Sequence, residues 1–483
     1  MTPFLKYSLT IIYALFILFT IVRILLDTHS TSKALAYILL VIIVPVAGSV
    51  FYFAFGVNYR HMARTKKGTE ELNAFTKVFR SHVQDDTVAI MEKNGEALGH
   101  YSELARFIHE IGGEDLNANQ YQLLINGEVK FPEVLRVLET ATHSIHLEYY
   151  DWENDTRGNQ IKTVLLKKIR EGVKVRVIYD DYASRKIKRN IVEELKKGGA
   201  EIYPAIKVRL VMFASRMNHR DHRKLVIVDG LTGFVGGINI SDRYDNSIDT
   251  GLYWRDTHVK ITGPTVKNIQ RHFLTHWNAL QPDRVEFQEE LFPEKIQQTD
   301  TSEFAQMQAG GPFYPMSNIM LTYFRIFSLA RKKLFITNPY FIPSDSILDA
   351  LKTASISGVD VRLMMPLKSD SAIVGAASQF YYQDLLQAGV KIYLYKKGFI
   401  HAKTVVADGM LSVVGTANMD IRSFELNMEI MSVIYGKNFA QQLEAAYLND
   451  IAECKELSCG DWMKNGMLKR LTIAIARLIS EFL

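Results

Sequence analysis

The chain has 483 residues, of which 48% are hydrophobic, and its formal net charge is +5. This length leaves room for two catalytic-size domains and additional segments. The mild positive charge suits an anionic surface such as acidic lipid, and it is too sparse to be typical of a nucleic-acid-binding protein. The two cysteines, Cys454 and Cys459, match no redox or zinc motif and exclude a disulfide framework, so we interpret them as structural.

Two apolar segments lie near the N-terminus. Phe4–Leu26 has charged residues only near its ends, Ala34–Phe55 carries no charge, and the polar loop Asp27–Lys33 separates them. Each segment is long enough to span a bilayer. No small-residue cleavage site precedes a mature start, which disfavours a signal peptide. Residues 1–57 are therefore expected to form two transmembrane helices.

A basic stretch follows the second apolar segment and contains Arg60, Arg64, Lys66 and Lys67. Because positive residues accumulate on the cytoplasmic side of membrane segments, this end of the hairpin is predicted to be cytoplasmic and the intervening loop external. The sequence thus predicts a multi-pass membrane protein whose remaining domains lie on the cytoplasmic side.

The segment 58–119 that follows the hairpin is polar and helix-prone. It contains no residues of recognisable chemistry. It is expected to be a helical linker between the membrane hairpin and the rest of the chain, lying along the membrane surface.

Strand and helix patterns alternate from Tyr121 onward. The predicted elements are, in chain order, a strand from Tyr121, a turn at Asn126-Gly127, a helix from Pro132, a strand over Ser144–Tyr150, a helix through Ile161–Arg170 and a strand over Gly172–Asp180. This alternation predicts an α/β domain with a mixed sheet.

Polar residues flank a short apolar run in the stretch 222–239. His222 and Lys224 are two positions apart at the start of the run LVIV, which is typical of a buried strand, so both side chains point to one face. The pair Asp-Gly at Asp229 is a strong hairpin-turn signal, and folding back about it sets Asn239 beside His222. An imidazole, an ammonium and a carboxamide on one surface form a cradle for an anion.

The same pattern recurs in the stretch 401–418. His401, Lys403, Asp408 and Asn418 repeat the spacing of the first copy at every position. One such match is weak evidence, but two in register within one chain indicate a duplicated half of an active site. Two cradles facing each other would make a phosphodiester site with two histidines.

The repeat extends beyond the two motifs. The second half predicts elements in the same order as the first, namely a helix over Met320–Ala330, a strand over Lys333–Pro343, a helix over Ile347–Thr353 and a strand over Gly358–Pro366. The acidic, proline-containing segment Gln281–Asp300 is predicted to link the halves. Two similar domains, 120–300 and 301–483, related by a pseudo-two-fold axis would place both motifs at one central cleft.

Simpler explanations apply to each motif residue taken alone. A single histidine beside a strand is usually a core or surface residue. Metal binding is disfavoured, because a lysine on the same face as each histidine would repel a cation and neither copy has partners at ligand spacing. Asp229 and Asp408 have the opposite strand parity to the histidines, so we interpret them as anchors of the turn and the strand end.

The C-terminal sequence WMKNGMLKRLTIAIARLISEFL has apolar residues at helical spacing with basic residues between them. The apolar positions are Leu468, Leu471, Ile475, Leu478, Ile479 and Phe482, and the basic positions are Lys464, Lys469, Arg470 and Arg477. Two interpretations stay open: a helix packed on the second domain, and a basic amphipathic helix on the cytoplasmic leaflet with Trp462 at the headgroup level.

These motifs resemble the phospholipase D superfamily and, more closely, the bacterial cardiolipin synthases. The resemblance rests on the two His-x-Lys-x4-Asp motifs, on GTANMDIRSFELNMEI after the second, and on GGINISDRY and YWRDTHVKITGP after the first. The stretch PVAGSVFYFAFGVNYR is similar to the membrane segment of that family, so the likeness covers nearly the whole chain. It departs from the family pattern at Asp221, where Asn is more frequent. It implies an α/β fold of two phospholipase D-like domains.

The resemblance also implies a mechanism that needs no metal or cofactor. His222 would attack phosphorus to form a phosphohistidine, and His401 would act as general acid and then base. Asp229 and Asp408 complete the two catalytic motifs. The groups expected to hold the phosphate charge are Lys224, Lys403, Asn239 and Asn418.

Two acidic residues, Asp256 and Glu429, follow the motifs at the start of apolar strands. In the family such acids orient a catalytic imidazole, and the alternative here is a surface or capping role. Arg255 and Arg422 are expected either to hold phosphate or to pair with carboxylates.

The function that the resemblance implies is the transfer of a phosphatidyl group between two phosphatidylglycerol molecules, which gives cardiolipin and glycerol. The alternatives are phosphatidylethanolamine as donor, water as acceptor, a membrane-tethered nuclease and a non-catalytic lipid-binding scaffold. Only Ser184–Asn190 has the basic character that a nuclease would need, so no nucleic-acid partner is expected. The resemblance further implies a location in the bacterial inner membrane, with phosphatidylglycerol and cardiolipin as lipid partners.

Overall fold

The computed structural model describes residues 3–28, 31–53, 59–83, 87–206, 219–281, 283–293 and 303–480. The ends of two predicted elements, at Phe55 and Phe482, lie outside these residues. The chain forms two compact units. The smaller contains the residues up to Lys67, and the larger contains nearly all residues from Gly68 onward, including both His-x-Lys motifs.

The first apolar segment forms a long helix in the smaller unit. Helix α1 covers Pro3–Asp27. Its stretch Tyr7–Asp27 is the one helix within the described residues that is long and apolar enough to cross a membrane. Many of its apolar side chains, such as Ile11 and Leu15, are exposed. The first predicted membrane segment is thus a helix of spanning length.

The second apolar segment does not form the single long helix that the sequence predicts. It is divided into α2, Thr31–Ile43, and α3, Pro45–Phe51. Proline lacks an N–H and clashes with a preceding helical turn, so Pro45 begins a new helix. The two helices fold back on each other and approach so closely at Gly48 that a Cβ there would lie only 2.6 Å from the Leu40 carbonyl oxygen. Each is shorter than the ~20 residues of a typical transmembrane helix.

The predicted linker 58–119 forms a series of helices. They are α4, Tyr59–His82; α5, Thr87–Lys93; α6, Gly95–Leu98; and α7, Ser102–Gly112. Phe79 of α4 and Leu104 and Ile108 of α7 are buried in the core of the larger unit. Because Leu104 and Ile108 are four residues apart, they give α7 one apolar face. From Gly68 onward these helices therefore pack within the larger unit.

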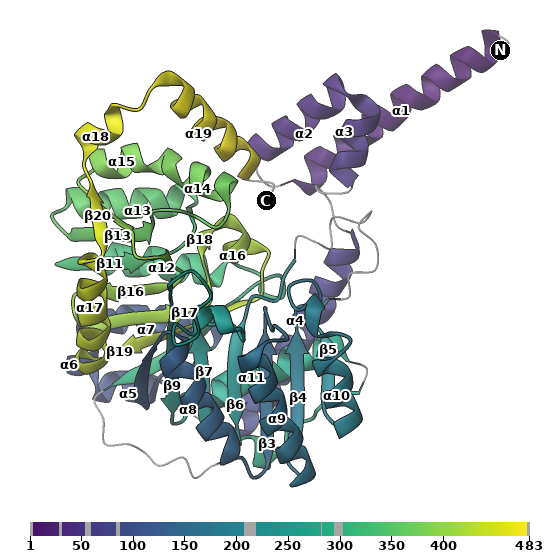
Figure 1. Cartoon of the computed structure of the whole chain (residues 1–483). Coiled ribbons are helices and arrows are strands. Elements are labelled where there is room, and N and C mark those ends of the chain that lie inside the picture. Colours follow the sequence, from purple (N-terminus) through teal and green to yellow (C-terminus); the bar gives the residue numbers. More distant parts are fainter. Residues whose placement is uncertain are drawn as a thin grey trace. The chain divides into compact units, whose positions relative to one another are not determined.

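The larger unit is built on two mixed β-sheets (Figure 1). The seven-stranded sheet has the order β2 (Gln120–Ile125), β9 (Thr257–Thr262), β7 (Thr232–Gly236), β6 (Lys224–Val228), β3 (Ser144–Tyr149), β4 (Lys174–Tyr179) and β5 (Glu201–Pro204). The nine-stranded sheet has the order β1 (Asn117–Ala118), β10 (Phe304–Gly310), β19 (Glu429–Tyr435), β17 (Leu411–Gly415), β16 (Thr404–Ala407), β11 (Lys333–Thr337), β13 (Asp360–Pro366), β14 (Lys391–Tyr395) and β20 (Cys454–Leu457).

The two sheets repeat one topology, which confirms the predicted duplication. The order β9-β7-β6-β3-β4-β5 in the first sheet corresponds to β19-β17-β16-β11-β13-β14 in the second. In both sheets the last three strands of this series are parallel and the others antiparallel. The predicted mixed sheets are therefore also confirmed.

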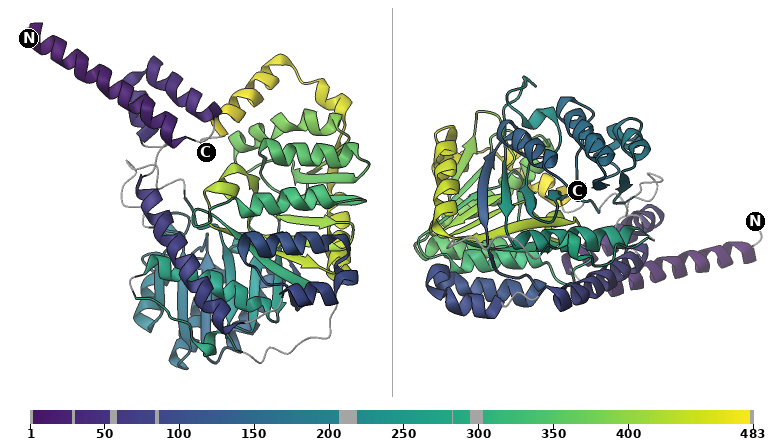
Figure 2. Two further views of the ribbon diagram at one scale, coloured as in Figure 1. Left: turned by 180° about the vertical axis from the view of Figure 1, so that it is seen from behind. Right: turned by 90° about the horizontal axis from the view of Figure 1, so that it is seen from below.

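Helices cover the outer faces of both sheets (Figure 2). Between the sheets, β7 packs directly on β17 and β19, and helices lie beside this contact. The outer helices of the first domain are α8 (Gly127–Glu139), α9 (Thr156–Arg170) and α10 (Ile191–Gly198), and those of the second are α12 (Asn318–Leu329) and α13 (Asp345–Ile356). Between the sheets lie α11 (Thr265–Leu280) and α17 (Lys437–Ile451). One core joins the inner faces of both sheets, since it contains Leu225 and Phe273 of the first domain and Val414 and Phe439 of the second.

Helix α8 begins earlier than predicted, at Gly127 instead of Pro132. The pair Asn126-Gly127 is not a turn between separate elements, because Asn126, with φ of 61°, leads directly from β2 into the helix. The missing N–H of Pro132 removes one hydrogen bond without ending the helix. Burial of Phe131 and Val134 on the sheet stabilises the helix around it.

Each His-x-Lys motif opens a tight β-hairpin, as the sequence predicts. Strands β6 and β7 pair antiparallel with Leu225 opposite Val235, and β16 and β17 pair in the same way. Asp229 and Asp408 occupy the turns with φ of 52° and 54°, a conformation that Asp tolerates better than most residues. The local Asp-Gly chemistry therefore sets the register of both hairpins.

Candidate active site

Short strand segments of the two domains pair in parallel with each other next to the motifs. Strand β15, Phe399–Ile400, pairs with β8, Trp254–Arg255, immediately before His401. The equivalent bridge in the other direction joins Asp221 to Met428, immediately before His222. Each histidine therefore stands beside the acidic residue of the opposite domain.

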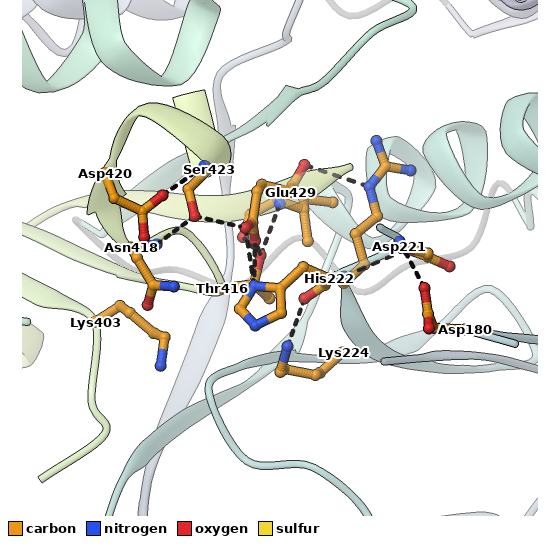
Figure 3. Close-up of polar contacts among 12 residues, drawn as sticks. Asp180, Asp221, His222, Lys224, Lys403, Thr416, Asn418, Asp420, Ser423 and Glu429 are labelled. Atoms are coloured by element: carbon orange, nitrogen blue, oxygen red, sulfur yellow. Dashed lines mark hydrogen bonds and ion pairs between the residues drawn. The ribbon is translucent and has the colours of Figure 1, made fainter. Parts of the chain in front are cut away.

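His222 lies against Glu429 of the second domain (Figure 3). Its Nδ1 is 2.8 Å and 3.0 Å from the two carboxylate oxygens. The hydroxyls of Thr416 and Ser423 donate to the same carboxylate at 2.5 Å and 2.9 Å. Burial raises the pKa of Glu429, but His222, Lys224 and the Thr416 hydroxyl together hold it below its ordinary value. This carboxylate therefore stays charged and orients the imidazole.

His401 forms the mirror-image contact with Asp256 of the first domain. Its Nδ1 is 2.7 Å from the Asp256 carboxylate. That carboxylate accepts from the Thr257 backbone N–H at 2.7 Å. Burial raises the pKa of Asp256 to about 6, against the opposing effects of Lys403 and other donors. A Cβ at Gly237 would lie 2.1 Å from Asp256 Oδ1, so the close approach depends on glycine.

The two lysines donate to the backbone of their own motifs. Lys224 Nζ lies 2.6 Å from the His222 carbonyl oxygen, and Lys403 Nζ lies 2.5 Å from the His401 carbonyl oxygen. Burial lowers the pKa of Lys224 to about 8 and that of Lys403 to about 7. An ammonium group with one protein partner keeps donors for a bound anion.

Both imidazoles share one electrostatic environment. Burial lowers the pKa of His222 to about 4, against the effect of Glu429. Burial also lowers the pKa of His401 well below its ordinary value, with further lowering by Lys403, Lys224 and His222. The structure thus brings both histidines and both lysines together. With each Nδ1 at a carboxylate, each ring has its Nε2 available for chemistry.

The two asparagines differ in their placement. The Asn239 side chain donates to the Tyr244 hydroxyl at 2.6 Å and accepts from the Asp151 N–H at 3.2 Å. The second N–H of this amide stays a donor for an anion, so the phosphate contact of Asn239 stays a prediction. Asn418 Oδ1 is buried without a hydrogen-bond partner among the described residues, and the side chain lies on the same side as Lys403 (Figure 3).

The two motif aspartates lie at the far ends of the hairpins from the histidines. Asp229 accepts from the N–H groups of residues 142–144, at the start of β3. Asp408 accepts from the N–H groups of residues 331–333, at the start of β11, and from the Tyr101 hydroxyl. Both carboxylates therefore tie a turn to the neighbouring strand, as anchors would.

The two arginines that followed the motifs also differ. Arg255 pairs with Asp450 through Nε at 3.0 Å and Nη2 at 2.8 Å, and its Nη1 donates to the Asp256 carbonyl. Pairing with a carboxylate is thus the arrangement found for Arg255. Burial lowers the pKa of Arg422, an effect that Asp420 opposes and Arg220 reinforces, so Arg422 lies among charges of both signs.

Sequence reasoning did not single out the aromatic rings around the histidines or the hydroxyls at Glu429. Tyr150 contacts His222 edge to face at a centroid distance of 4.8 Å. The rings within 6.3 Å of His401 are those of Tyr244, Trp254, Tyr340 and Phe399. Strand parity could have indicated Thr416, two residues before Asn418. The rings come from short strands and turns that are far apart in the sequence, and they carry no local signal.

One buried group behind His222 has the residue types of a metal site. One ligand atom from each of Glu148, Asp221 and His276 lies within 4.8 Å of the others. Glu148 Oε1 already has two partners: Arg223 Nη1 lies 3.6 Å from it, and His276 Nδ1 lies 2.7 Å from it. The departure from the family pattern at Asp221 therefore falls in a charged network whose main cation is Arg223.

Comparisons with known proteins agree with this architecture. The family described as "Cardiolipin synthase, PLD-like domain" matches residues 134–277 and 323–451, and "Phospholipase_D-nuclease N-terminal" matches residues 12–56. A cardiolipin synthase of Alkalihalophilus pseudofirmus is 35% identical over 478 residues, covering 99% of this chain and 94% of that one. Cardiolipin synthase 2 of Bacillus cereus is 37% identical over 466 residues, covering 95% and 88%.

A solved structure shows the same fold at low sequence identity. The phosphatidylserine synthase of Haemophilus influenzae aligns with a TM-score of 0.57 and 15% identity over 79% of this chain and 97% of that chain. The fold and the paired motifs define a protein with two phospholipase D-like domains. The chain belongs to the cardiolipin synthase family.

Proposed function

We propose that this protein is a cardiolipin synthase that transfers a phosphatidyl group from one phosphatidylglycerol to another and releases glycerol. The observation that supports it most is the pair of crossed contacts, His222 with Glu429 and His401 with Asp256, with two lysines beside them. The full-length similarity to cardiolipin synthases supports the same reaction. The enzyme is thus a phosphatidyltransferase.

In the first step His222 Nε2 attacks phosphorus. An N–P bond forms and the P–O bond to the leaving glycerol breaks. His401, whose pKa the negative charge of the bound phosphodiester raises so that it carries a proton, gives that proton to the glycerol oxygen. His222 is proposed as the nucleophile because Glu429, held by two hydroxyls, stays charged and stabilises the imidazolium that forms.

In the second step His401, now neutral, takes the proton of an incoming phosphatidylglycerol hydroxyl. The new O–P bond forms, the N–P bond breaks, and His222 returns to its starting state. Lys224, Lys403 and Asn418 hold the charge on the equatorial oxygens through both steps. The aromatic rings around His401 exclude water, which favours a lipid alcohol over hydrolysis.

The same proposal includes the cell membrane. The apolar helix α1 and the family give a membrane-associated protein. We place the catalytic domains on the cytoplasmic side of the bacterial inner membrane, because the basic stretch with Lys66 and Lys67 follows the second apolar segment. The protein is multi-pass if both apolar segments cross the bilayer, which requires that α2 and α3, folded back on each other here, straighten into one span. Single cysteines at Thr28 and Asn438 are labelled with a membrane-impermeant reagent in intact cells to test this topology. Labelling at position 28 and protection at position 438 are expected. Protection of both positions would contradict an external loop.

The experiment that tests the activity uses membranes from a cardiolipin-free bacterial host that expresses the full chain, supplied with labelled phosphatidylglycerol. Cardiolipin and free glycerol are expected, and both are lost in His222→Ala and His401→Ala. The exposed His143→Ala serves as the matched control and keeps full activity. Phosphatidic acid as the sole product would show hydrolysis instead. Turnover only with added phosphatidylethanolamine would identify a different donor, and turnover only with nucleic acid would overturn the proposal.

A further inference from the structure

The C-terminal helix α19, Met467–Ser480, has two different apolar faces. Its inner face packs on α14, Ala372–Ser378, where Ile473 and Ala476 are only 6% and 7% exposed. Its outer face carries four aliphatic side chains that are 48–82% exposed, namely Leu468, Leu471, Ile475 and Leu478. At about 100° per residue, these two rows lie on opposite sides of the helix. The packing interpretation therefore holds for the inner face, and the exposed outer face leaves the membrane interpretation open.

Cationic groups border the exposed row. Arg470 is exposed, and the Arg477 guanidinium stacks on the ring of Phe380 at 4.3 Å. The Lys464 side chain, just before the helix, is 78% exposed. A helix with one docked face, one exposed apolar face and basic flanks has the geometry of a helix that lies in a membrane interface.

A pocket of about 350 Å³ opens beside the first turn of α19. Lys455 of β20 and Lys469 of α19 line it, together with Ser378, Gln379 and Asp461, whose carboxylate pairs with Lys464 at 3.0 Å. Trp462 forms part of the wall, with the Lys469 ammonium 5.3 Å from its ring. Two ammonium groups with polar and aromatic neighbours suit a phosphate on an amphiphilic molecule.

The pocket is separate from the two histidines but faces the same end of the second-domain sheet. Pro339 and Pro366, which follow or end the parallel strands β11 and β13, line it. His401 precedes β16, which runs antiparallel to β11, so it lies at this end as well.

We propose that α19 and this pocket form a second anionic-phospholipid site. The outer face of α19 lies among the acyl chains of the cytoplasmic leaflet, while Lys455 and Lys469 hold the phosphate of one headgroup. The occupant is a bilayer lipid because the aliphatic row begins at Leu468, the chain neighbour of the pocket residue Lys469, and an anionic phospholipid matches both features. The site rests on the proposed function only for the presence of such lipid in the substrate membrane.

The membrane contact is tested with the full chain in nanodiscs. Cys454 and Cys459 are replaced by serine, His401→Ala prevents turnover, and an environment-sensitive fluorophore is attached at Leu471→Cys. With phosphatidylglycerol in the nanodisc, a blue shift and quenching by spin-labelled lipid are expected. The same label at Asn438→Cys, exposed on α17, gives the matched control without quenching. An absence of quenching at position 471 would contradict insertion of α19 into the membrane. A fluorescence shift that depends on protein concentration in detergent would indicate self-association instead.

The headgroup pocket is tested by the lipid retained on the purified full chain, in the same His401→Ala background, counted by native mass spectrometry. Lys455→Ala with Lys469→Ala is expected to lower the retained phosphatidylglycerol several-fold. Lys196→Ala with Lys197→Ala, exposed on α10, removes the same charge elsewhere and leaves retention unchanged. Equal retention of phosphatidylcholine would overturn anion recognition, and displacement by inorganic phosphate would assign the pocket to free phosphate. Because the protein is inactive in both tests, their failure is distinct from failure of the transfer activity.

Discussion

His222 Nδ1 lies 2.8 Å from the carboxylate of Glu429, a residue 207 positions later in the chain and in the other domain. The reverse contact joins His401 to Asp256 at 2.7 Å. Each imidazole is therefore oriented by the domain that does not carry it. In the proposed mechanism, catalysis therefore depends on the way the two domains are held together.

Glu429→Gln is expected to lower kcat about 100-fold or more with little change in KM, because the neutral amide no longer stabilises the imidazolium of His222. Initial rates of phosphatidylglycerol consumption in mixed micelles measure this. Glu425→Gln, exposed on the nearby helix Ile421–Glu425, is the control and keeps normal rates. A variant with unchanged kcat would show that Glu429 does not act through His222.

The activity is expected to depend on pH through three buried groups. Burial raises the pKa of Asp256 to about 6, so below this pH the carboxyl is protonated and no longer supports His401. Burial lowers the pKa of Lys403 to about 7 and of Lys224 to about 8, so above these values the free enzyme loses cations that bind phosphate. A plot of kcat/KM against pH is therefore bell-shaped with macroscopic limits in this range. If Asp256→Asn left the acidic limb in place, Asp256 would not be its source.

Gly237→Ala is expected to displace the Asp256 carboxylate, since the new Cβ would lie 2.1 Å from Oδ1. We expect a loss of stability of about 1–3 kcal/mol and a larger fractional loss of kcat. Thermal unfolding and rate measurements on the same preparation test both. Gly460→Ala, where nothing lies within 4 Å of the added Cβ, is the control. Wild-type activity in Gly237→Ala would show that the close packing at Asp256 is dispensable.

Asp408→Ala is expected to destabilise the fold by about 2–4 kcal/mol, because three backbone N–H groups lose a charged acceptor. Burial raises the pKa of Asp408, but these N–H groups hold it below its ordinary value. Its stabilisation is thus present above the unfolded pKa and is lost as pH falls through the folded one. Denaturant unfolding at several pH values tests this. Full stability with abolished turnover would instead make Asp408 a catalytic group.

Local chemistry explains how much of this structure could be predicted from the sequence. The Asp-Gly turns, the buried runs between them and the repeated spacing are short-range features, so both hairpins and the duplicated sheets were predictable. Pro45 was misread because a long apolar run outweighed one helix breaker. Pro132 was misread in the opposite sense, since tertiary burial of Phe131 and Val134 sustains the helix around it.

The rest depends on contacts between distant parts of the chain. The strand that begins at each acid was predictable, but the contact of the acid with the opposite histidine arises only when the two domains pack. The same applies to Tyr101, which donates from the helical segment before the first domain to the turn residue Asp408. Nothing in the polar sequence around Tyr101 marks that partner.

The exchanged carboxylates also bear on how such a molecule could have arisen. A chain with a single copy would present a histidine without its acid, and only a second identical chain facing it could supply both missing halves. Its activity would then rise with the square of its concentration when dilute. Joining the copies in one polypeptide removes that dilution limit. It also lets the halves diverge: the acid beside His222 accepts from the hydroxyls of Thr416 and Ser423, whereas burial raises the pKa of Asp256, the acid beside the other imidazole, to about 6.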